Sequence, residues 1–170
     1  MPAGVSAYTA LANVTLGSSA ATVTFSSISQ AYRDLVLVIS GTKTTSSGDF
    51  VNVEINANTT AANYSQIAME GNGSSTWSGS ASGSYAFVTN GLNNPTFSNS
   101  QVANTVFQFM DYSATDKHKT VLVRGNKADA AVTAVANRFA STSAITQLKV
   151  MLYADSFATG STFALYGVSA

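Results

Sequence analysis

Apolar side chains recur at every second position in the last third of the chain, and this period predicts β-strands. Leu148, Val150 and Leu152 form one such run, and Phe163 and Leu165 belong to another. A two-residue period turns one face of each strand toward a core and the other toward water. The segment between the runs contains the Asp, Ser and Gly of a turn, so we expect a closing hairpin whose Phe163 and Leu165 complete the core.

The N-terminal half shows the same period. Residues 10–16 and 21–25 flank a short segment of small residues and predict an early hairpin. Residues 35–39 read LVLVI and are apolar throughout, which is typical of a core strand covered on both faces. Residues 51–55 read VNVEI, so we expect a strand whose polar side chains face water.

Other segments require a choice between alternatives. Residues 104–112 and 119–124 both alternate, and the turn-like SATDKH between them predicts that they pair. In residues 128–139 the alanines favour a helix and the β-branched side chains favour a strand, and the surrounding strands make a strand the better prediction. Residues 58–70 have no clean period and fit either a bent strand or a single helical turn.

These segments add up to about nine or ten short strands joined by turn-rich loops, with no long helix. Such a pattern predicts an all-β fold, specifically an antiparallel β-sandwich of the jelly-roll type. The sequence has no internal repeat, and residues 1–170 are predicted to form one domain.

The composition narrows the classes of partner. Charged residues make up only 9% of the 170 residues and apolar ones 45%, and the formal net charge is zero. A chain without net charge has no field to attract nucleic acid or anionic lipid, and weak repulsion leaves self-association unopposed. The chain has no cysteine, and we expect neither a signal peptide nor a membrane span.

The chemistry-bearing residues give no catalytic motif. His118 is the only histidine, and its place in DKHK between two strands is typical of a solvated turn residue. Neither a zinc centre nor a nucleophilic triad can be assembled from one histidine, and no GxSxG motif is present. The carboxylates are scattered singly, so a glycosidase-like acid pair and a calcium site are both disfavoured. We therefore expect no enzyme activity, no cofactor and no metal site.

One long stretch stands apart from this pattern. Residues 71–101 are dominated by Gly, Ser and Asn and predict a long surface excursion, with a strand at residues 84–89. Trp77, Tyr85 and Phe97 interrupt it. Aromatic side chains on a polar loop can stack on sugars or anchor a protein interface, and the alternative is that they tuck under the loop as a satellite cluster.

The residues also resemble a known group of proteins. The order TLGSSAATVTFSSISQAYRDLVLVISGT, then NYSQIAMEGNGSS, then GSTFALYGV is similar to small virion proteins of tailed bacteriophages. That group shares an opening TLGS…VTFSSI…Y.DLVLV, a central NYS…GNG and a terminal GS.F.LYG. The similarity runs from Leu16 to Val168 and is weakest around residues 77–101. None of these motifs is catalytic, since they mark strand and turn positions.

The resemblance implies a structural role on a phage particle. The expected function is a capsid decoration or cement protein that binds the major capsid protein and resists internal DNA pressure. By analogy with other jelly-roll decoration proteins, the expected assembly is a homotrimer on the capsid surface of the virion. The alternative is a tail-fibre module that binds a receptor or carbohydrate, with Trp77 and Tyr85 as stacking platforms. A polysaccharide depolymerase is disfavoured because no acid pair is visible.

Overall fold

The computed structural model describes residues 7–46, 49–82, 96–127 and 131–169. These residues form two antiparallel sheets, one of eight strands and one of four. The large sheet has the order β1 (Tyr8–Thr15), β12 (Thr162–Val168), β3 (Asp34–Gly41), β8 (Ala103–Met110), β9 (Lys119–Lys127), β10 (Ala131–Phe139), β5 (Tyr64–Gly71) and β6 (Thr76–Ser82). The small sheet has the order β2 (Thr22–Phe25), β11 (Leu148–Leu152), β4 (Asp49–Ile55) and β7 (Thr96–Phe97).

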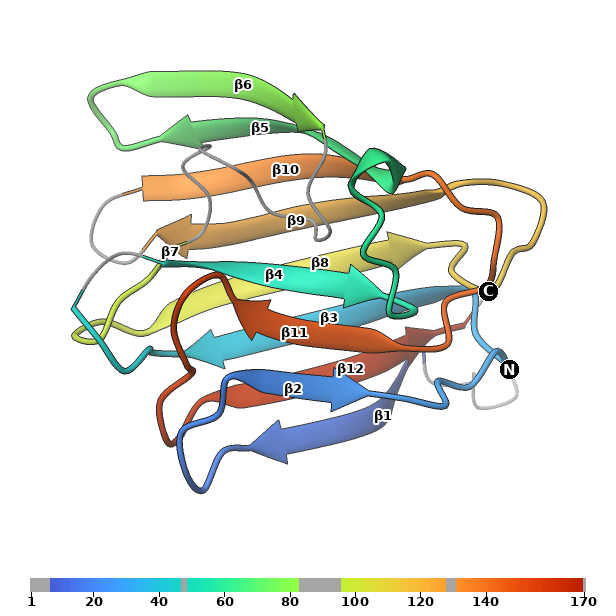
Figure 1. Cartoon of the computed structure of the whole chain (residues 1–170), viewed down its shortest axis with the longest axis horizontal. Coiled ribbons are helices and arrows are strands. Elements are labelled where there is room, and N and C mark those ends of the chain that lie inside the picture. Colours follow the sequence, from blue (N-terminus) through green and yellow to red (C-terminus); the bar gives the residue numbers. More distant parts are fainter. Residues whose placement is uncertain (1–6, 47–48, 83–95, 128–130, 170) are drawn as a thin grey trace, which may run out of the picture.

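The strand order is that of a jelly roll with an extended sheet. The chain crosses between the sheets from β1 to β2, β2 to β3, β3 to β4, β4 to β5, β6 to β7, β7 to β8, β10 to β11 and β11 to β12. Strands β1, β12, β3 and β8 therefore stand against β2, β11, β4 and β7 as two four-stranded layers. Strands β9, β10, β5 and β6 continue the large sheet, and Figure 1 shows β10, β5 and β6 reaching past the small sheet. The prediction of an all-β antiparallel sandwich is confirmed.

Both predicted terminal hairpins are wrong. Strand β1 pairs with β12, and β2 pairs with β11, so neither the early nor the closing pair of strands forms a hairpin. The alternation of apolar residues correctly identified the strands and their buried faces. It carries no information about which strands pair with each other. Packed sheets lie about 10 Å apart, and the connections 16–21 and 153–161 are long enough to cross that distance.

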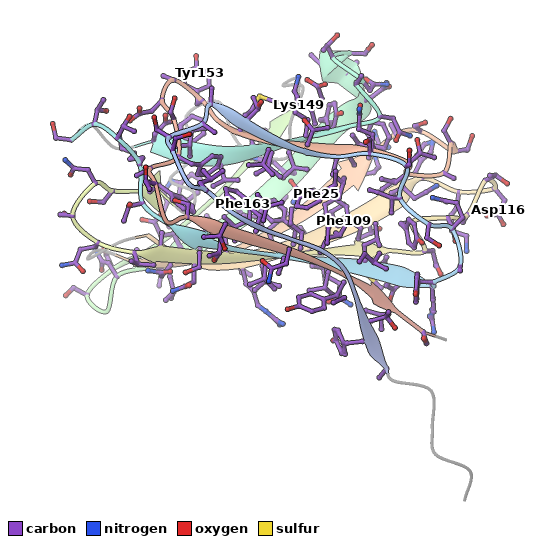
Figure 2. The ribbon with its side chains drawn as sticks, turned by 90° about the horizontal axis from the view of Figure 1, so that it is seen from below. Phe25, Phe109, Asp116, Lys149, Tyr153 and Phe163 are labelled. Atoms are coloured by element: carbon purple, nitrogen blue, oxygen red, sulfur yellow. The ribbon has the colours of Figure 1, made fainter. Side chains whose placement is uncertain are left out.

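The core lies between the two layers. Phe163 is fully buried and Leu165 is 2% exposed, which confirms the predicted core face of the last strand. The ring of Phe157, in the connection before β12, contacts Phe163 edge to face at a centroid distance of 4.8 Å and Phe97 at 5.7 Å. Figure 2 shows Phe163 between the layers together with Phe25 and Phe109. Aromatic side chains from both sheets and from a connection thus hold the sandwich together.

The sequence-based prediction is confirmed for the central strand β3 and is wrong for one face of β4. Strand β3 lies between β12 and β8, and Leu35, Leu37 and Ile39 are fully buried, as predicted for a core strand. In β4 the prediction of a wet face is wrong, because Asn52 and Glu54 are also buried. The Glu54 carboxylate forms an ion pair with Lys149 Nζ on the neighbouring β11 at 2.9 Å. This ion pair compensates the cost of burying the Glu54 charge.

The remaining elements resolve the open alternatives. Residues 58–70 contain both features considered for them, a 3₁₀ turn at Ala61–Asn63 followed directly by β5. Strands β8 and β9 pair as predicted, and β10 is a strand. Strand β6 was not expected, and residues 84–89 lie outside the described residues. No helix in the described ranges is long and apolar enough to cross a membrane.

The junction between the 3₁₀ turn and β5 gives a testable prediction. Tyr64 is buried, and its hydroxyl donates to Asn58 O at 2.8 Å and accepts from Ile55 N at 3.3 Å. Tyr64→Phe removes these bonds and is expected to lower the free energy of unfolding by about 1–2 kcal/mol in chemical denaturation.

The same side chain predicts an alkaline response. Burial, partly offset by the Ile55 N–H bond, raises the pKa of Tyr64 from 10.0 to about 12. The folded state therefore holds this proton more tightly than the unfolded state, and its contribution is complete below pH 10 and lost between pH 10 and 12. Stability should fall less steeply over that range in Tyr64→Phe. The exposed Tyr153→Phe is the matched control and should leave the slope unchanged.

Candidate functional site

The aromatic residues expected on a long loop do not lie together on the surface. Trp77 is on β6, half-buried, and packs against the hydrophobic core. Phe97 is on β7 and fully buried, so its assignment to an exposed ligand loop is wrong. Tyr85 lies outside the described residues. The environment of Trp77 therefore fits the alternative in which the ring is packed rather than exposed. Trp77 and its cross-strand partner Glu70 both lie on the face of the sheet that is turned toward the core.

The only histidine, His118, is exposed as the sequence predicted, whereas the lysine that follows it is buried. His118 is exposed in the connection between β8 and β9. Lys119 follows it and is fully buried, and its ammonium donates to the carbonyl oxygens of Ala114, Lys117 and Thr142 at 2.7, 3.0 and 3.3 Å. Burial lowers the pKa of Lys119. The ammonium joins this connection to the one that follows β10, because two of its carbonyl partners lie in the first and Thr142 lies in the second.

The most enclosed carboxylates also have structural partners. Asp49 accepts the backbone N–H groups of Tyr153 and Ala154 at 3.1 and 2.9 Å. Asp155 accepts Lys43 Nζ at 2.9 Å, and Lys43 is fully buried. Among the described residues, no group of three or more His, Cys, Asp or Glu side chains could hold a metal ion.

The outstanding surface is the side of the large sheet that points away from the small sheet, which we call the outer face. Cross-strand partners share a face, so the pairing register assigns each side chain. Ile67 and Met69 on β5 and Val132 on β10 are each more than 60% exposed there. Leu122 on β9 and Met110 on β8 are also exposed on this face. Most of the large exposed apolar side chains in the described residues therefore gather on one sheet face.

The sheet extension differs from an ordinary half-buried sheet, because large apolar side chains stand on its outer face as well as on its inner face. On β5 the outer side chains Ile67 and Met69 are apolar, whereas Gln66 and Glu70 point to the inner side. On β10 the outer Val132 is apolar, and the inner positions carry the buried apolar Val135 and Phe139 as well as Thr133 and Asn137. An apolar face left to water costs solvation free energy at about 25 cal/mol per Å². Apolar patches of this kind mark interaction sites.

The outer face is also hollowed. One hollow of about 940 Å³ lies over β5, β6, β8, β9 and β10, with Met69, Val106, Arg124 and Val132 in its lining. A second hollow of about 280 Å³ shares Met69, Val106 and Arg124 with it, so the two adjoin each other. A third, of about 570 Å³, lies toward the end of β10, with Ile67 and Arg138 in its lining.

Three charged side chains of the described residues stand on the outer face. Arg124 and Arg138 are exposed and form no ion pair with any residue in the described part of the chain. Asp34, at the start of β3, accepts the backbone N–H of Asp111 through Oδ1 at 2.8 Å. The surface therefore combines aliphatic side chains with two unpaired guanidinium groups and one carboxylate. It suits a partner with apolar groups and matching charges.

Sequence periodicity contained part of this signal. Ile67 and Met69 stand two positions apart in residues 58–70, although that segment has no clean period, and Val132 and Leu122 fall on predicted strands. The sequence could not show that these positions share one face, because that depends on the pairing of β5 with β10 and of β10 with β9.

Comparisons with known proteins give distant structural neighbours. No family model and no curated protein matches the sequence. Among solved structures, an alginate lyase variant in complex with an alginate trisaccharide aligns with a TM-score of 0.33 at 5% identity, over 92% of this chain and 80% of that chain. A second variant, with an alginate tetrasaccharide, aligns with a TM-score of 0.27 at 5% identity, over 81% and 71% of the two chains. Likeness at this level carries no argument about function.

Proposed function

We propose that this chain is a structural protein of a bacteriophage virion, of the capsid decoration or cement class, which acts through protein–protein contacts. The observation that carries the proposal is the outer face, where exposed Ile67, Met69 and Val132 form an apolar surface on a rigid sheet. The resemblance of the sequence to small virion proteins supports the same class. Partners in this proposal are other copies of the chain and the major capsid protein.

The mechanism follows from mass action. A protein that binds the assembled shell and not its dissociated subunits stabilises the shell by the free energy of that binding. Several copies joined in one oligomer add avidity, because each further contact is then intramolecular. A low net charge and a pre-formed β-sandwich suit this role, since little conformational entropy is lost when rigid surfaces dock.

Location on the particle tests the proposal. In cryo-electron microscopy of the phage particle that carries this chain, we expect density for the jelly roll on the outside of the capsid shell. Purified chain added to shells that lack it should bind and raise the temperature at which they release DNA. Density confined to the tail would replace this function with the tail-module alternative. Absence of the chain from the particle would contradict both.

A further inference from the structure

The outer face has a symmetry that its pairing register makes visible. Eight strands divide at the line between β8 and β9 into two halves of four, β1, β12, β3 and β8 on one side and β9, β10, β5 and β6 on the other. A second copy turned by 180° about an axis along this line, parallel to the strands, would lay each half over the opposite half. Side chains in one cross-strand row, equally far from the line, would then meet.

The charged residues of the outer face satisfy this condition. Thr120 pairs with Met110 on β8 and with Arg138 on β10. Continuing the register of β3 with β8 by one residue from Leu35 and Phe109 places Asp34 opposite Met110. Asp34 and Arg138 therefore lie in one row, each on the second strand from the dividing line. The symmetry would bring Asp34 of each copy to Arg138 of the other.

We propose that the outer face binds the outer face of a second copy of this chain, about a two-fold axis parallel to the strands between β8 and β9. Two reciprocal Asp34–Arg138 ion pairs flank the axis in this arrangement. The same operation covers the exposed aliphatic side chains of β5 and β10 with the other half of the sheet. The inference rests on the proposed function only in taking the outer face as a protein interface, and it replaces the homotrimer expected by analogy with a two-fold pair.

Shape supports the same pairing. Tyr166 on β12 stands in a row with Val36, Gln108, Leu122, Ala136 and Ile67. It lies as far from the dividing line as Ile67 does on the other side, so the two would meet across the interface. Tyr166 is half-buried and packs edge to face against the exposed Tyr8 at a centroid distance of 6.5 Å. This aromatic pair would be presented to the 570 Å³ hollow beside Ile67 and Arg138.

The available area is sufficient for a stable pair. Eight strands spaced about 4.8 Å apart give a face ~34 Å wide, and strands of this length are ~25 Å long. Full contact would bury about 850 Å² on each copy, close to the ~800 Å² per partner of a standard interface. A two-fold contact is also the commonest way in which identical chains associate.

An acidic polysaccharide is the main rival occupant of the hollows. Its carboxylates would complement Arg124 and Arg138, but sugar sites commonly use aromatic rings as stacking platforms. The described residues that line the outer-face hollows are a mixture of aliphatic and polar side chains, and the single aromatic among them, Trp77, packs against the core. Aliphatic and methionine side chains fit a protein surface better.

Charge reversal of the two residues tests the pairing. The purified wild-type chain should have twice the 17.5 kDa mass of one chain in light scattering after size exclusion. Arg138→Asp and Asp34→Lys should each raise the dimer dissociation constant roughly a hundredfold, because like charges then face each other twice. An equimolar mixture of these two variants should recover the dimer, since each copy then offers the complement of the other. The double variant should pair with itself.

The controls separate pairing from folding and from the virion role. Lys117→Asp makes the same change of charge at an exposed loop position, where it removes only the ion pair of Lys117 Nζ with Asp111 at 3.5 Å, and the dimer should persist. Circular dichroism should show each variant folded, and Asp34→Lys is checked closely because Asp34 also binds Asp111 N. A monomeric or trimeric wild type, or a dimer that ignores Arg138→Asp, would overturn the pairing. Recovery in the mixture uses purified protein alone, so it stands or fails independently of where the chain lies on a particle.

Discussion

Phe163→Asp is expected to abolish the folded state. Phe163 is fully buried and its ring contacts Phe157, which in turn contacts Phe97, so the three rings form a continuous contact across the core. Loss of a buried phenylalanine costs about 3–5 kcal/mol, and an unpaired carboxylate in an apolar site adds several more. A domain of this size has a total stability of only about 5–15 kcal/mol. Circular dichroism should show no cooperative thermal transition.

Two control variants separate the effect of a buried charge from the loss of ring volume and from the added charge itself. Phe163→Leu keeps an apolar side chain and should fold with a loss of about 1–3 kcal/mol. Thr24→Asp introduces the same charge at an exposed position of β2, next to Lys149 on β11, and should change stability by less than about 0.5 kcal/mol. A cooperative transition in Phe163→Asp near that of the wild type would show that this face of β12 is not the core face.

Asp155→Ala is expected to be the most destabilising change outside the hydrophobic core. The Asp155 carboxylate accepts Lys43 Nζ at 2.9 Å, Thr44 Oγ1 at 2.5 Å and Thr45 N at 3.0 Å. Removing one partner of a buried ion pair costs about 3–5 kcal/mol, because the other charge is left in a dry site. Lys43 is fully buried and would be that charge. Chemical denaturation measures the loss.

The comparison for this change is a carboxylate that has no such role. Asp116 is exposed in the connection between β8 and β9, at the end of the molecule where Figure 2 labels it. Asp116→Ala should alter stability by less than about 0.5 kcal/mol. Equal effects of Asp116→Ala and Asp155→Ala would contradict the structural role of the Lys43–Asp155 pair.

The same carboxylate predicts the response to acid. Burial alone raises the pKa of Asp155, but the hydrogen bonds from Lys43, Thr44, Thr45 and the Ser156 N–H outweigh it and hold that pKa well below its usual 3.8. Below pH 3.8 the Asp155 carboxylate is protonated in the unfolded chain but stays ionised in the folded chain. The stabilising contribution is therefore complete above that pH and declines as the pH falls further. Asp155→Asn should show a shallower loss of stability between pH 4 and 2.

The sequence predicted elements better than it predicted neighbours. The alternation in residues 148–152 and 162–168 correctly identified two strands and their core-facing residues, because burial of one face is a local property. The hairpin expected between them does not form, since pairing is decided by the whole sandwich. The burial of Lys119 also depends on contacts that a local sequence pattern does not show. A lysine in DKHK is expected in water, yet it lies on the inner phase of β9, where three carbonyl groups converge on it.

The candidate site was harder to predict, for a physical reason. Aromatic residues in a Gly/Ser/Asn-rich stretch suggested a binding loop, but Trp77 is in a strand and Phe97 is in the core. The outer face consists of single side chains drawn from strands far apart in sequence, such as Met69 on β5 and Leu122 on β9. Each is unremarkable alone, because isolated exposed apolar residues are normal. Only the sheet register brings them together.

The order of strands in the large sheet has a consequence for folding during synthesis. Strand β3, the most apolar segment, is flanked by β12 and β8, and both follow it in the chain. Partners so distant in sequence make folding slow, because the entropy of closing long loops is lost before the contacts form. Until β8 and β12 have emerged from the ribosome, the LVLVI strand has two unpaired edges. The interval before those strands arrive is when this chain is most exposed to misassociation with other nascent chains.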